Sequence, residues 1–94
     1  MSEEVLKSEE LEEALKDCPM WEVEGESIMR RFEFEDFNDA MEFVNLVAEV
    51  AEAAQHHPDI DIRYNKVTLH LETHEIHGVT EADVELATRI DNLE

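Results

Sequence analysis

The chain has 94 residues, 43% of them hydrophobic, which is enough apolar material for the core of one small domain spanning residues 1–94. Its 26 Asp and Glu residues against 7 Lys and Arg residues give a formal net charge of −19, which excludes electrostatically driven binding to nucleic acids and to anionic membrane surfaces. No apolar run approaches the roughly 18 to 20 residues of a membrane span, and the acidic N-terminus is unlike a secretory signal, so we expect a cytoplasmic protein.

The first predicted elements are a helix and a β-hairpin. The helix covers Ser8–Asp17, where apolar residues recur at helical spacing, and Pro19 ends it. Two runs then flank Gly25, over Met20–Glu24 and Ser27–Phe34, and the second alternates apolar and polar residues as a half-buried strand does. The pair predicts a hairpin that turns around Gly25.

A long helix is predicted next. Asp36 is a typical N-cap, with Asp39 three residues later, and apolar residues follow helical spacing for about five turns to Ala54. Further apolar residues widen this surface beyond a single core stripe and suggest contact with a partner subunit: Phe43, Leu46 and Val50.

Pro58 ends the long helix, and a second hairpin follows. Apolar and polar residues alternate over Ile60–Tyr64 and again over Val67–Leu71, and the intervening Asn65-Lys66 predicts the turn.

The last predicted element is a helix that begins at a capping box. Gly78 breaks the strand region, and Thr80 with Asp83 three residues later precedes apolar residues at helical spacing up to Leu93. The element order is therefore α-β-β-α-β-β-α. It predicts an α+β fold in which a four-stranded antiparallel sheet carries its helices on one face.

The acidic residues are spread from Glu3 to Glu94 and interleaved with apolar residues, unlike the charge block of a disordered tail. So large a net charge destabilises a compact monomer in dilute buffer by self-repulsion, and salt screens that repulsion. We therefore hypothesise a salt-adapted protein. Its thermal unfolding midpoint is expected to be higher in about 3 M KCl than in about 0.1 M KCl, and equal midpoints would contradict the hypothesis.

Five histidines, at positions 56, 57, 70, 74 and 77, fall within 22 residues of one another. His56 and His57 stand where the long helix ends, and His74 lies just after the fourth predicted strand. Because a tight hairpin places the start of its first strand beside the end of its second, we expect His57 and His74 to lie near one pocket.

Three interpretations of these histidines compete. Metal binding is suggested by the spacing of His70, His74 and His77, but His70 falls in a strand pattern, where residues four apart stand more than about 12 Å from each other. We therefore predict no metal site. General acid–base catalysis fits because imidazole titrates near neutral pH. The third interpretation is that they are surface residues of a very acidic protein.

Other common chemistries lack their residues. The two glycines, Gly25 and Gly78, cannot form a glycine-rich phosphate loop. The single cysteine, Cys18, cannot form an internal disulfide, which fits a reducing compartment, and we treat it as a small apolar residue. Trp21 is more often a core residue than a ligand platform, although a flat ligand would favour stacking on it.

Several segments, taken in order and spacing, resemble the pterin-4a-carbinolamine dehydratase family. They are Trp21-Glu22-Val23-Glu24-Gly25, Phe34-Glu35-Asp36-Phe37-Asn38, Glu52, His56-His57-Pro58, Tyr64-Asn65-Lys66-Val67, Thr73-His74-Glu75, Gly78 and Asp83. The resemblance covers about Pro19 to Asp91. It implies dehydration of 4a-hydroxytetrahydropterin to quinonoid dihydropterin and water, with no metal or organic cofactor.

The same resemblance implies roles for residues. His56 and His74 carry the proton transfers, and His57 binds and orients the pterin; which of the first two is the acid stays open. Residues implied in substrate binding or in support of the pocket are Trp21, Glu52, Gln55, Pro58, Thr73, Glu75 and Asp83. Glu52 or Glu75 could fix an imidazole tautomer, and Trp21 could stack on the pterin. Gln55 departs from the acidic residue usual there, and Ile76-His77 replaces small residues.

The resemblance also implies a homodimer or homotetramer. Two alternatives to the dehydratase remain. One is a non-catalytic binding or assembly module that uses the apolar surface of the long helix and leaves the histidines dispensable. The other is an enzyme of molybdopterin metabolism with the same site and a different substrate.

Overall fold

The computed structural model describes residues 4–93, which form three α-helices, two short 3-10 helices and one four-stranded sheet. The helices are α1 (Ser8–Ala14), η1 (Leu15–Asp17), α2 (Phe37–Ala54), η2 (His74–Ile76) and α3 (Glu81–Asp91), and the strands are β1 (Glu22–Glu24), β2 (Ser27–Glu33), β3 (Asp59–Arg63) and β4 (Lys66–Leu71). Within the described range, no helix has both the length and the apolar character needed to cross a membrane.

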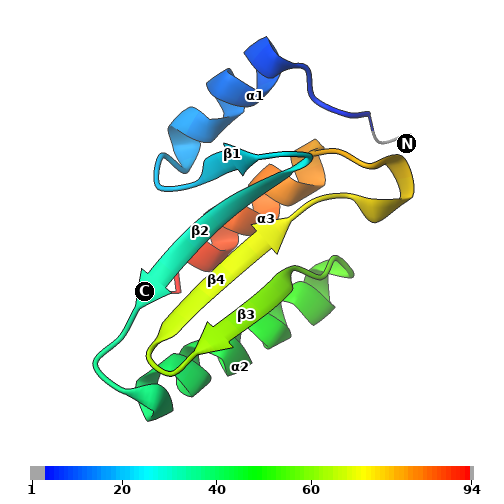
Figure 1. The fold of residues 1–94 in the computed structure, drawn as a ribbon. Helices are drawn as coiled ribbons and strands as arrows, with labels where there is room; N and C mark the ends of the chain where they lie inside the picture. The colour runs from blue at the N-terminus through cyan, green and yellow to red at the C-terminus, as the bar shows by residue number, and fades with distance from the viewer. Residues whose placement is uncertain (1–3, 94) are drawn as a thin grey trace.

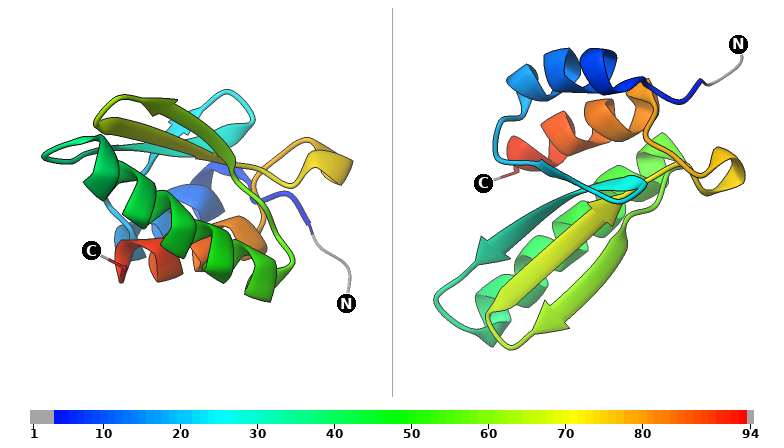
Figure 2. Two further views of the ribbon diagram at one scale, coloured as in Figure 1. Left: turned by 90° about the horizontal axis from the view of Figure 1, so that it is seen from below. Right: turned by 45° about the horizontal axis from the view of Figure 1, so that its top comes forward.

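The sheet is antiparallel throughout, with strand order β1-β2-β4-β3 (Figure 1). Each predicted hairpin forms, and β2 pairs with β4 to join them at the centre of the sheet. Figure 2 shows the helices on one face of this sheet, and its other face is open. The predicted α+β fold is therefore confirmed, including its element order.

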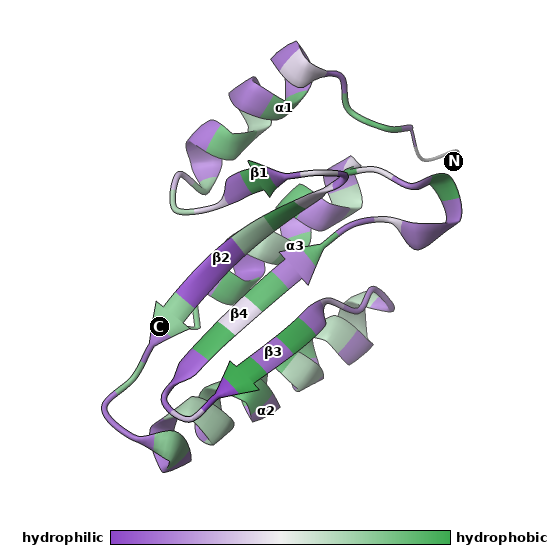
Figure 3. Cartoon of the chain, viewed as in Figure 1, coloured by the Kyte–Doolittle hydropathy of each residue, from purple (hydrophilic) through white to green (hydrophobic). Residues whose placement is uncertain are grey.

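The core lies between the sheet and the helices. Apolar and hydrophilic residues alternate along β3 in Figure 3, as expected for a strand with one covered face. The buried apolar side chains belong to all three α-helices, to β2 and β4, and to the loops beside them: Leu11, Cys18, Trp21, Ile28, Phe32, Ala40, Phe43, Val47, Ala51, Val67, Leu69, Leu71, Val79, Val84, Leu86, Ala87 and Ile90.

Three local predictions need correction. The first α-helix stops at Ala14 and tightens into a 3-10 turn before Pro19. The second hairpin turns at Tyr64 and Asn65, because Lys66 already pairs with Arg63 in the ladder. Tyr64 takes the positive φ of 53° that the short turn needs, whereas the Asn65 side chain donates to the carbonyl of Phe34 at 2.9 Å.

The third correction concerns α2. Its predicted N-cap is confirmed, since the Asp36 side chain accepts a hydrogen bond from the backbone N–H of Asp39 at 2.8 Å. Phe43, however, is a core residue with 4% exposure, and Val50 packs against the core, so only Leu46, at 42%, presents a largely exposed apolar side chain from the proposed partner surface. A five-turn helix on a small sheet buries more of its circumference than a single stripe.

Cys18 is fully buried, in agreement with its treatment as a small apolar residue. Burial, helped by the negative charge of Asp91, raises the pKa of the thiol, and a hydrogen bond with Thr88 opposes the rise. A thiol with a raised pKa is a weak nucleophile, so this side chain contributes packing.

A polar network ties the end of α3 to the sheet. Asp91 Oδ1 accepts hydrogen bonds from the indole N–H of Trp21 at 2.9 Å and from the guanidinium of Arg30 at 2.6 Å. The Arg30 guanidinium also lies 4.2 Å from the centre of the Phe32 ring. The side chain of Arg30 is only 14% exposed, and these partners help to stabilise its charge.

Asp91→Ala is expected to lower the free energy of unfolding by about 2–4 kcal/mol, because it removes the shared acceptor of two largely buried donors. Urea unfolding measures the change. Asp61→Ala is the control, since Asp61 pairs with Arg63 on the surface and its loss is expected to cost less than about 0.5 kcal/mol. Equal losses in both variants would contradict the structural role of Asp91.

Candidate active site

The centre of the site is the carboxylate of Asp83, in the first turn of α3, which is fully buried. Its Oδ2 accepts hydrogen bonds from the backbone N–H of Thr80 and from the hydroxyl of Thr73, each at 2.9 Å. The predicted capping box of Thr80 and Asp83 is thus confirmed. A buried carboxylate is tolerated only where donors surround it, so the start of α3 holds this side chain in one orientation.

The other oxygen of Asp83 faces His56. The ring Nε2–H of His56 donates to Oδ1 of Asp83, because a carboxylate can only accept. This contact leaves Nδ1 of the neutral ring as its free acceptor nitrogen. An imidazole whose tautomer is set by a carboxylate is a typical arrangement for a general base.

The end of α2 directs His56 toward α3. Gln55 adopts the left-handed conformation, with φ of 53°, and its N–H donates to the carbonyl of Glu52 at 3.2 Å. The N–H of His56 donates to the carbonyl of Ala51 at 3.1 Å, which completes a Schellman C-cap. This cap changes the chain direction ahead of Pro58, and it therefore fixes the direction in which His56 projects from the end of α2.

His57 lies on the exposed side of the same helix end. Its ring Nε2 is 2.5 Å from Oε2 of Glu52, as the tautomer-fixing role suggested for that residue requires. Both side chains are more than half exposed, at 59% and 71%. This pair therefore stands at the surface, beside the pair formed by the partly buried His56 and the buried Asp83.

His74 begins η2, directly after Thr73, and is 60% exposed. Its Nε2 lies 3.9 Å from Asp59 at the start of β3, and its Nδ1 lies 3.7 Å from Glu72. The structure therefore brings His74 to the residues that follow His57, but neither His57 nor His74 lines the pocket beside His56 described below, so a pocket shared by these two histidines stays a prediction. Through its neighbour Thr73, His74 is also linked to Asp83.

The remaining predicted site residues have different surroundings. Gln55 is exposed and caps α2, and Pro58 is half-buried. Glu75 is exposed beside His74. Trp21 is 3% exposed and bound to Asp91 at the far end of α3, so the structure does not bring it to the histidines, and we assign it a packing role.

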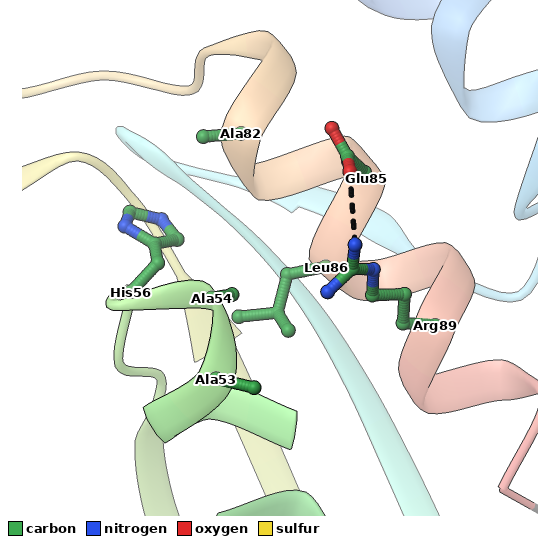
Figure 4. A pocket seen from close by; sticks show the side chains of 7 residues that line it. All are labelled: Ala53, Ala54, His56, Ala82, Glu85, Leu86 and Arg89. Atoms are coloured by element: carbon green, nitrogen blue, oxygen red, sulfur yellow. Dashed lines mark hydrogen bonds and ion pairs between the residues drawn. The ribbon is translucent and has the colours of Figure 1, made fainter.

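A pocket of about 230 Å³ opens between α2 and α3 beside His56 (Figure 4). Its lining residues are Ala53, Ala54, His56, Ala82, Glu85, Leu86 and Arg89. Arg89 and Glu85, which pair at 3.4 Å, were not predicted from the sequence. Their spacing from Ala82 indicates one face of the last helix, but only the packing of α3 on α2 shows that this face meets His56.

The group of ligand-type side chains that the structure brings together differs from the set of His70, His74 and His77 considered for a metal. In residues 4–93, the one group of ligand-type side chains close enough to share an ion is Glu26, Glu72 and His77, whose ligand atoms lie within 4.8 Å of one another. Exposed acidic groups often gather in so acidic a chain, and we assign no metal to them.

Comparison with known proteins shows which family model and which relatives this chain matches. Residues 4–93 match the family model described as pterin 4 alpha carbinolamine dehydratase. A protein of Thermomicrobium roseum provisionally named pterin-4-alpha-carbinolamine dehydratase is 52% identical to this chain, and the match covers 84% of this chain and 85% of that protein. A protein of Acidobacterium capsulatum with the same provisional name is 54% identical, and the match covers 88% of this chain and 90% of that protein.

Two solved structures share the fold. A transcriptional coactivator/pterin dehydratase from Brucella melitensis superposes with a TM-score of 0.90 at 38% identity and covers 96% of this chain and 98% of its own. A pterin dehydratase-like protein identified as a RuBisCO assembly factor of the alpha-carboxysome has a TM-score of 0.64 at 23% identity, with 78% and 84% covered. The second likeness shows the fold alone.

Proposed function

Because the chain belongs to the pterin-4-alpha-carbinolamine dehydratase family, we propose that it dehydrates a 4a-hydroxytetrahydropterin to the quinonoid dihydropterin and water. The C4a–O bond breaks, and its electron pair leaves with the oxygen, which takes up a proton. The neighbouring ring nitrogen loses its proton, and the electron pair of that N–H bond forms the new C=N bond. The reaction thus needs one base and one acid, and no change of oxidation state.

The observation that carries the proposal is the contact of His56 with the buried carboxylate of Asp83. It supports His56 as the base, since Nδ1 is then the free acceptor nitrogen. His74, which stands 3.7 and 3.9 Å from two carboxylates, is proposed as the donor to the departing hydroxyl. His57, held by Glu52, is proposed to bind and orient the pterin.

In the proposal, the other residues predicted to bind substrate position the histidines or shape the site. Thr73 and Asp83 orient His56, whereas Gln55 and Pro58 shape the end of α2. Glu75 is exposed beside His74 and is free to contact substrate. No metal or organic cofactor takes part in the proposed reaction.

The direct test is a stopped-flow dehydration assay with a 4a-hydroxytetrahydropterin in several salt concentrations. Spontaneous dehydration in protein-free buffer is the baseline. We expect the protein to accelerate the reaction in proportion to its concentration. A rate equal to the baseline at every salt concentration would reject the proposal.

A non-catalytic binding or assembly role is the second candidate, because the Brucella melitensis relative is named both a transcriptional coactivator and a pterin dehydratase. The two functions differ in their use of the histidines, because an assembly module needs none of them. An enzyme of molybdopterin metabolism would keep the histidines and turn over a different pterin, so the choice of substrate in the assay separates it from the main proposal.

We further propose that the protein forms a homodimer or homotetramer in the cytoplasm. β3 lies at the edge of the sheet, and Ile60 on it and Leu46 on α2 are 38% and 42% exposed. An open strand edge and exposed apolar side chains favour self-association. A light-scattering mass of one subunit in high salt would contradict it.

A further inference from the structure

The strongest feature outside the roles assigned above is the position of two carboxylates on either side of the His74 ring. Asp59 faces Nε2 at 3.9 Å, and Glu72 faces Nδ1 at 3.7 Å. Neither residue was predicted as part of the site. The carboxylates suggested from the sequence to fix an imidazole tautomer were Glu52 and Glu75, and Glu75, adjacent to His74, is exposed.

Both carboxylates stand on backbone that is fixed, and the Asp59 side chain itself is 67% exposed. Asp59 is the first residue of β3 and pairs with His70 in the sheet. Glu72 follows β4 immediately and is 21% exposed, with its oxygen also within 4.8 Å of the ring of His77. The backbone beside it is fixed, because the N–H of Thr73 donates to the carbonyl of Gly78 at 2.8 Å.

His74 itself lacks such support from packing. Its side chain is 60% exposed and begins a single 3-10 turn, so rotation about its side-chain bonds costs little without polar partners. Whichever ring nitrogen carries a proton, a carboxylate lies on that side of the ring. In the protonated ring that serves as the proposed proton donor, both nitrogens carry a proton, so the two carboxylates attract it from both sides and favour one ring orientation.

We propose that Asp59 and Glu72 are positioning residues that hold the His74 ring for proton transfer, an inference that rests on the proposed dehydratase function. They act through His74 and touch neither the substrate nor the reacting atoms. The contribution of such a residue appears in kcat more than in KM, because it orients a group that works in the transition state.

The test uses Glu72→Gln and Asp59→Asn, which keep side-chain size and remove charge. Each is expected to lower kcat about tenfold with KM changed less than about twofold. In a His74→Ala background, neither substitution is expected to lower kcat further, because the group that it positions is gone.

Two variants of the outer sheet face provide matched controls. Glu24→Gln removes a carboxylate 3.5 Å from His70, and Asp61→Asn removes one two residues along β3 from Asp59. Both are expected to keep kcat within about twofold of the unmodified protein. An equal fall in the controls, an unchanged kcat in Glu72→Gln and Asp59→Asn, or a further fall in the His74→Ala background overturns the inference.

NMR of the histidine rings gives a readout without turnover. The ring signals of His74 are expected to shift in Glu72→Gln and Asp59→Asn and to stay in place in Glu24→Gln and Asp61→Asn. If the unmodified protein fails to accelerate dehydration, the proposed function fails, and the NMR result still decides whether the two carboxylates hold the ring. Unshifted His74 signals overturn the inference by themselves.

Discussion

Replacing His56 or His74 by alanine is expected to lower the dehydration rate by at least about a hundredfold, the usual contribution of a general acid or base. The two losses have different origins. His56→Ala removes the ring that Asp83 orients from its buried position, and His74→Ala removes the ring between Asp59 and Glu72. Stopped-flow turnover, compared with spontaneous dehydration in buffer, measures both.

The control is His70→Ala. His70 is half-buried on the outer face of β4 and lies 3.5 Å from Glu24, and its partner in the ladder is Asp59 and not His56 or His74. It is expected to keep near-normal turnover. Near-normal turnover in both His56→Ala and His74→Ala would remove the catalytic assignment and favour the assembly role, for which the histidines are dispensable.

Asp83→Asn is expected to lower turnover by about a hundredfold or more and to reduce the free energy of unfolding by about 1–3 kcal/mol. The carboxylate accepts from His56 with one oxygen and from Thr73 and Thr80 with the other. An amide has one accepting oxygen, so its NH₂ group must face a donor on one side or the other. Either the helix cap is lost or His56 must take the other tautomer, with its proton on Nδ1.

Turnover and urea unfolding separate these two effects when both are measured on the same variant. Glu81→Gln, an exposed carboxylate in the first turn of the same helix, controls for the loss of charge near the helix N-terminus and is expected to change the free energy of unfolding by less than about 1 kcal/mol. A folded Asp83→Asn variant with normal turnover would show that His56 does not need its carboxylate partner.

Much of the fold could be predicted because its signals are local. The N-caps at Asp36 and Thr80 and the alternation along the strands each act within a few residues. Errors arose where a local preference was overridden. Asn65 favours a turn, yet the pairing of Lys66 with Arg63 moved the turn one residue back and put Tyr64 into the left-handed conformation.

The candidate site was predictable in part for the same reason. The His-His-Pro segment follows a helix end, and His74 follows a strand, so their positions depend on neighbouring residues and on one hairpin. The role suggested for Trp21 did not follow from any such signal. A tryptophan that stacks on a ligand and one that packs against Asp91 and Phe32 have the same local sequence.

The sequence by itself determined the element order, the pairing of strands in each hairpin, the helix caps and the clustering of histidines, because periodicity and capping are short-range properties. Only the tertiary structure decided that Asp83 faces His56 and that Asp59 faces His74, because the residues of each pair lie far apart along the chain. In a chain with 26 acidic residues, every histidine has acidic neighbours in sequence, so proximity along the chain cannot choose among them. The packing of α3 against α2 and the pairing of β3 with β4 make that choice, since they fix segments that lie far apart along the chain.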